Sequence, residues 1–171
     1  MEENLFDIME RMESLIPEYS YTSVKCIIET DKKFKQVLVS EIKKIKDYMF
    51  HVVQVSYELQ RDKLSEAAET VWDDISSIVS RIEVSKTCDR KGKQACADCK
   101  KRIEKNLREL IRKDRELVVA VKDMKTVAYA LYKELLEKGR EKYFIKNLDK
   151  IKTYNDEIIS LLEEREKSIL G

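Results

Sequence analysis

Apolar residues recur every three or four positions along most of this chain, the spacing that gathers them on one side of an α-helix. A first stripe covers residues 2–16 and ends before Pro17, because proline disfavours helix at the position before it. The pattern predicts an all-α protein, an antiparallel up-and-down helical bundle of about four long helices plus a short N-terminal helix, in one domain over residues 1–171. The four long helices are expected at about residues 30–60, 64–86, 97–138 and 141–170.

The stripe changes phase between the second and third predicted helices. Leu59 and Leu64 are five positions apart, and neither glycine nor proline lies between them. We expect a turn at residues 61–63. One long helix with a stutter over residues 30–86 fits the same pattern, and both possibilities stay open.

The last two stripes can be aligned as an antiparallel hairpin that turns at Gly139. The residues of these two stripes are called seam residues. Each seam residue of one helix then faces the residue of the other helix for which the two residue numbers add up to 279, beginning with Leu135 and Phe144. In this register Asp114 faces Arg165, and they are the two charged residues on the seams. We predict that their ion pair sets the register of the hairpin. The alternative is two unrelated surface charges.

Composition narrows the class of protein further. The chain has 171 residues, with three glycines, one proline and 43% hydrophobic residues, which excludes collagen-like, low-complexity and many-stranded β proteins. Lys and Arg number 34 against 33 Asp and Glu, and a net charge of +1 argues against general binding to nucleic acids or membrane surfaces. The longest run of apolar residues without tyrosine, residues 117–121, is far shorter than the ~20 residues of a membrane span. We expect a cytoplasmic protein with no membrane partner.

Three of the four cysteines cluster in a polar segment, the expected loop at residues 86–99. Cys96 and Cys99 have the two-residue gap of a zinc knuckle, and Cys88 supplies a third thiol. Cys26 is the candidate fourth ligand, because its helix begins at the same end of the bundle. This set predicts one structural zinc ion. A disulfide within the loop and simple free thiols are the alternatives.

The same segment is the most basic part of the chain, with a local charge of +5 over residues 86–102. It could bind an anion, a nucleic acid backbone or an acidic partner. A solvated loop is the other interpretation, since no aromatic residue is present there to stack on a base. The candidate anion ligands are Arg90, Lys91, Lys93, Lys100 and Lys101.

Catalytic motifs are missing from the sequence. The single histidine, His51, lies among apolar residues, and no Glu-x-x-His pair is present for a di-iron site. Glu66 and Glu69 superficially resemble the magnesium-binding helix of all-α nucleotide pyrophosphohydrolases, but the partner motif of that class is absent. Solvated helix charges explain them better.

These observations predict a non-enzymatic interaction or structural protein. The expected partner is another protein or a second copy of the chain, because the predicted 97–138 helix outruns its neighbour and would leave apolar residues to cover. The alternative is a zinc-binding or redox-sensing helical module with a basic cysteine loop.

Overall fold

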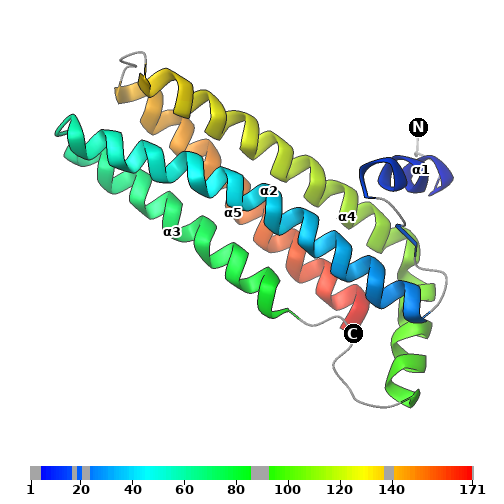
Figure 1. Ribbon diagram of the computed structural model, residues 1–171. Helices are drawn as coiled ribbons and strands as arrows, with labels where there is room; N and C mark the ends of the chain where they lie inside the picture. The colour runs from blue at the N-terminus through cyan, green and yellow to red at the C-terminus, as the bar shows by residue number, and fades with distance from the viewer. Residues whose placement is uncertain (1–4, 17–18, 21–23, 86–92, 137–140, 171) are drawn as a thin grey trace. The chain divides into compact units, whose positions relative to one another are not determined.

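A computed structural model describes residues 5–16, 19–20, 24–85, 93–136 and 141–170. All regular secondary structure in these segments is helical, which confirms the predicted all-α bundle (Figure 1). The predicted turn at Gly139 and the predicted stop at Pro17 lie outside the described residues. The helices are α1 (Leu5–Leu15), α2 (Val24–Glu58), α3 (Asp62–Val84), α4 (Lys93–Leu136) and α5 (Glu141–Leu170).

Two helices begin before the approximate residues expected from the sequence, and each difference has a physical reason. Helix α2 begins at Val24 rather than near residue 30, because polar residues interrupt its buried stripe: Thr30 and Asp31 both point inward and are buried. Helix α4 begins at Lys93 rather than residue 97, so the last part of the predicted 86–99 loop is helical. Its first turn is rich in good helix formers but lacks an apolar period, and periodicity alone could not detect it.

Two helices, α2 and α3, rather than one long helix follow each other between Val24 and Val84. Helix α2 ends with a Schellman motif, in which the backbone N–H of Gln60 donates to the Tyr57 carbonyl at 3.0 Å and that of Arg61 to the Ser56 carbonyl at 2.9 Å. Gln60 adopts a left-handed conformation, with φ of 54°. The turn lies slightly before the predicted residues 61–63. It had no glycine signal because a glutamine occupies the position that glycine favours.

This cap leads to a stability prediction. Gln60→Gly is expected to raise the free energy of unfolding by about 0.5–1 kcal/mol, since glycine has no Cβ to oppose a positive φ. The matched control is Glu58→Gly in the last turn of α2, which should lower it by about 1 kcal/mol. Urea unfolding followed by circular dichroism measures both. Equal losses in the two variants would contradict the cap.

The described contacts group into two compact units. Unit 1 comprises Met1–Leu38, Val84–Val118 and Ser160–Gly171, and unit 2 comprises Val39–Glu83 and Val119–Ile159. Helices α2, α4 and α5 each contribute to both units. The prediction of a single domain stays a prediction.

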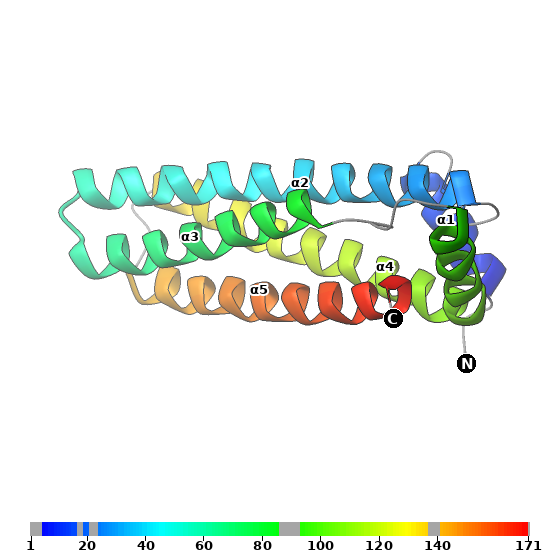
Figure 2. The same cartoon turned by 90° about the horizontal axis from the view of Figure 1, so that it is seen from below.

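Unit 2 is built from helices of alternating direction. Helices α2 and α3 are antiparallel, with Lys43 bonded to Glu83 at 2.8 Å and Tyr57 to Glu69 at 3.3 Å, and Figure 2 shows them side by side. Helices α2 and α4 run in the same direction and touch along one edge. The apolar core of the unit contains Ile42, Ile45, Met49, Val52, Leu64, Ala68, Val71, Ile75, Ile78, Ile82, Val121, Met124, Ala128, Leu131, Phe144, Leu148, Ile151 and Ile158.

Unit 1 contains a buried ionic network at its centre. The Arg165 guanidinium of α5 pairs with Asp114 of α4 through Nε, and its Nη1 atom lies 2.6 Å from Oδ1 of Asp31 on α2. Tyr19 donates its hydroxyl hydrogen to the second Asp114 oxygen at 2.7 Å, and the Phe34 ring lies 4.7 Å below the guanidinium. All five side chains are buried. The predicted Asp114–Arg165 pair is therefore confirmed, and with it the hairpin register in this unit.

Candidate functional site

The structure describes only one of the four candidate metal ligands. Cys99 is a buried free thiol in unit 1, and its Sγ lies 3.8 Å from the Ile169 carbonyl oxygen, to which it donates. Cys88 and the side chains of Cys26 and Cys96 lie outside the described residues. No group of three metal-ligating side chains occurs among those that are described. The zinc site stays a prediction.

The candidate anion ligands are likewise only partly described. Lys100 pairs with Glu104 one turn along α4 at 3.5 Å, and Lys101 is exposed. Arg90, Lys91 and the side chain of Lys93 lie outside the described residues. The described contacts bring no two of the five together, so the anion site also stays a prediction.

The structure instead places a groove between α2 and α4 in unit 2. Its volume is about 520 Å³. Residues seven apart on α2 form one wall, and residues at the i, i+3, i+4 and i+7 positions of α4 form the other, because these spacings share a helix face. The lining residues are Glu41, Tyr48, Lys122, Lys125, Thr126 and Tyr129.

An aromatic cluster lies at the groove, and two of its rings, Tyr48 and Tyr129, line it. The Tyr48 ring of α2 contacts two rings of α4, those of Tyr129, at a centroid distance of 5.5 Å, and Tyr132, at 5.3 Å. Tyr129 stacks on Tyr132 at 6.2 Å, and His51 packs against the edge of Tyr132 at 4.7 Å. The Tyr129 side chain remains 45% exposed. A large amphipathic ring is therefore offered to solvent on a rigid helical support.

Positive charge predominates around the groove. The Glu41 carboxylate is bonded to Lys125 Nζ at 2.6 Å and to Lys44 Nζ at 2.5 Å, and these contacts, the Lys125 hydrogen bond first, lower the pKa of Glu41. Lys122 is exposed and forms no ion pair within the described part of the chain. Lys133 Nζ lies 5.4 Å from the Tyr129 ring centroid. Among the lining residues, two lysines, Lys122 and Lys125, thus accompany one carboxylate that is already paired.

His51, Trp72 and Glu66 do not line the groove. His51 is half-buried, and its Nε2 atom has no hydrogen-bond partner among the described residues. Trp72 is half-buried; its ring lies 6.1 Å from that of Phe50, and Lys46 Nζ lies 4.9 Å from its centroid. Glu66 is exposed on α3, as a solvated helix charge would be.

Sequence reasoning missed the groove because its tyrosines lie beside the seams rather than on them. Tyr48 precedes the seam residue Met49, and Tyr129 follows Ala128. The available signal was the Tyr129 and Tyr132 pair, three residues apart on a lysine-rich helix face. The pair forms a candidate site only through its contact with Tyr48, which lies 81 positions before Tyr129 in the sequence.

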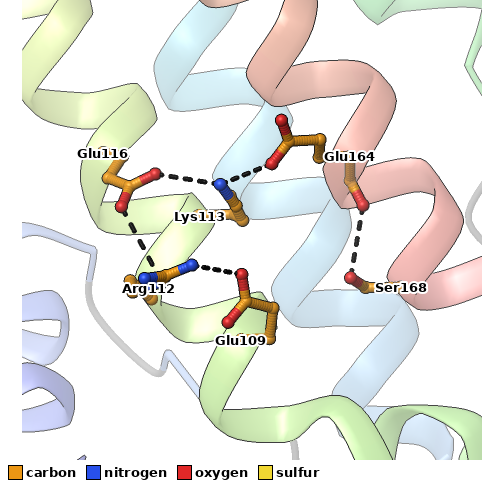
Figure 3. Close-up of polar contacts among 6 residues, drawn as sticks. All are labelled: Glu109, Arg112, Lys113, Glu116, Glu164 and Ser168. Carbon is orange, nitrogen blue, oxygen red and sulfur yellow. Dashed lines mark hydrogen bonds and ion pairs between the residues drawn. The ribbon is translucent and has the colours of Figure 1, made fainter.

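A surface ladder of charges joins α4 to α5 in unit 1 (Figure 3). Lys113 Nζ lies 2.5 Å from Glu164 and 3.3 Å from Glu116, and Arg112 lies 2.5 Å from Glu109. The Glu164 hydrogen bond raises the pKa of Lys113, and the same bond lowers the pKa of Glu164. The ladder supports the antiparallel pairing of the two helices.

This ladder predicts an acid-dependent loss of stability. Because the folded pKa of Glu164 lies below its ordinary value of 4.5, its stabilisation is present above about pH 4.5 and is lost as the pH falls through the folded pKa. Urea midpoints measured from pH 7 to pH 3 should therefore fall less in Glu164→Gln than in the unaltered protein. The control is Glu157→Gln, an exposed carboxylate on the same helix, which should follow the unaltered protein. A Glu164→Gln curve parallel to that of the control would contradict the ladder.

Comparison with known proteins adds no functional information. No known protein family, curated protein or solved structure matches this chain. Among the described helices, none combines the length and the apolar character that crossing a membrane requires.

Proposed function

We propose that this protein is a non-enzymatic interaction module that binds a protein partner in the groove between α2 and α4 of unit 2. The observation that carries the proposal is the tyrosine cluster, in which Tyr48 of α2 contacts Tyr129 and Tyr132 of α4, with Tyr48 and Tyr129 lining the groove. Tyrosine is enriched among the residues that contribute most to protein–protein binding.

The support beneath the cluster favours binding over simple surface packing. The helix turns that carry Tyr48 and Tyr129 are anchored by buried neighbours, Met49 and Ala128, both fully buried. A ring held on such a support loses little conformational entropy when a partner covers it. The Glu41–Lys125 bond further ties the two walls together. The groove is therefore preformed, which lowers the free-energy cost of association.

Site-specific photo-cross-linking tests this proposal. A photoreactive p-benzoylphenylalanine replaces Thr126, which lines the groove, and in a control protein it replaces Lys150, which is exposed on α5 of the same unit. Each protein is expressed in the cells that make the natural chain and is irradiated there. We expect a discrete cross-linked protein from position 126 and not from position 150.

A second change makes the result specific to the tyrosines. Tyr129→Ala should abolish the cross-link from position 126. Tyr143→Ala, which removes a ring of similar exposure outside the groove, should leave it intact. Identical cross-linking from both positions, or a cross-link that survives Tyr129→Ala in a folded protein, would overturn the proposed function. Circular dichroism confirms folding of each variant.

A further inference from the structure

We propose that the segment bound in the groove is acidic and carries an aromatic or aliphatic anchor, and this inference rests on the proposed function. The groove offers two kinds of surface side by side. The rings of Tyr48 and Tyr129 favour an apolar side chain, and Lys122, two turns before Tyr129 on α4, favours a carboxylate. A partner that supplies only one of these groups would leave the other surface uncovered.

The state of the carboxylate in the groove determines the sign of the partner. Glu41 is bonded to both Lys125 and Lys44, so its negative charge is satisfied within the chain. Lys122 is exposed and remains available, and Lys133 Nζ lies 5.4 Å from the centroid of the Tyr129 ring. The unmatched charge at the groove is therefore positive. Complementarity requires Asp or Glu from the occupant.

Two other occupants fit the groove less well. A second copy of the chain would bring its own lysines against these lysines, and like charges at a shared interface oppose association. A single-stranded nucleic acid would find rings to stack on, but the Tyr48 and Tyr129 planes are inclined by 53°, which does not make a continuous platform. The lysines also cover only a few turns of helix, whereas phosphate binding uses many cations along a track. An acidic protein segment is favoured.

Selection from a phage-displayed library of random 16-residue peptides tests the inference on the whole protein. We expect the selected peptides to be enriched in Asp and Glu around one aromatic or leucine residue. A synthetic copy of the strongest peptide is then measured by fluorescence anisotropy. Tyr129→Ala should weaken its binding at least tenfold, and Lys122→Glu at least fivefold. Lys150→Glu, a charge reversal on an exposed position of α5, should change binding less than twofold.

The possible outcomes separate the inference from the proposed function. Peptides that need Tyr129 but are not acidic and ignore Lys122→Glu would overturn the inference and leave the groove as a binding site. Peptides unaffected by Tyr129→Ala would overturn the inference, while the cross-link from position 126 would still decide the proposed function. Tyr129-dependent binding of fluorescein-labelled dT16, or a dimer in sedimentation velocity that Tyr129→Ala dissociates, would replace the acidic segment with nucleic acid or a second copy.

Discussion

Replacement of Arg165 with methionine is expected to lower the free energy of unfolding by about 3–5 kcal/mol, the largest loss that we predict for a single change. Arg165 is the cation between two buried carboxylates, those of Asp31 and Asp114. Both carboxylates are fully buried, and the arginine is 2% exposed. Methionine fills a similar volume but supplies no charge, so two carboxylates would remain in a low-dielectric interior without their shared partner.

The measurement is urea unfolding at neutral pH, with Lys167→Met as the control. Lys167 is exposed on the same helix, and its replacement should change stability by less than about 0.5 kcal/mol. A loss below about 1 kcal/mol in Arg165→Met would show that the arginine is not buried between the carboxylates.

Replacing the whole network should have a very different effect from breaking it. When Arg165→Met is combined with Asp31→Leu, Asp114→Leu and Tyr19→Phe, the guanidinium and both buried carboxylates are removed together. Lys35, which pairs with Asp31 at 2.7 Å, keeps a partly exposed side chain. Buried ion clusters exchanged for apolar residues of similar size are often neutral or more stable. We therefore expect most of the loss to be recovered in the combined variant. A loss equal to that of Arg165→Met alone would assign the effect to packing rather than to charge.

Asn155→Leu is expected to raise the free energy of unfolding by about 1–3 kcal/mol. Asn155 lies on the seam of α5 in unit 2 and is 2% exposed. Neither its Oδ1 nor its Nδ2 atom has a hydrogen-bond partner in the described part of the chain. An amide buried in this way gives up its hydration without compensation, whereas leucine of similar size gains from burial.

The matched control lies two turns earlier on the same helix. Asn147 is also buried, at 8% exposure, but its Nδ2 donates to the Tyr143 carbonyl at 2.8 Å. Asn147→Leu loses that hydrogen bond and should gain less stability than Asn155→Leu. The fluorescence of Trp72, the only tryptophan, follows unfolding in this unit. A less stable Asn155→Leu protein would indicate that the amide is satisfied within the core.

The fold could be predicted from sequence wherever the buried positions are apolar. The α3 stripe is an example, since all six seam residues from Leu64 to Ile82 are buried as expected. The pattern was less informative where buried positions are polar. Thr30 and Asp31 are buried but interrupt the apolar stripe, so the stripe did not extend to the first turns of α2. The pairing of Asp114 with Arg165 could be predicted from the hairpin register. The contact between Arg165 and Asp31 could not. This contact depends on a third helix, whose packing the hairpin pattern does not contain.

The groove shows the same limit for the functional site. A stripe of apolar residues reports which side of a helix is buried, but not which helix lies beside it. The Tyr48 contacts with Tyr129 and Tyr132 join two parallel helices that are not consecutive in the chain. The sequence drew attention to the cysteine loop because its pattern is local. The tyrosine site is visible only after the helices are assembled.

The most direct test of the central claim is the affinity of the cross-linked partner for the groove. The purified partner is titrated by calorimetry into the unaltered protein, Tyr129→Ala and Tyr143→Ala, all shown to be folded. If the tyrosine groove is the binding surface, Tyr129→Ala raises the dissociation constant at least tenfold, while Tyr143→Ala changes it less than twofold. Equal dissociation constants for the three proteins would contradict the claim.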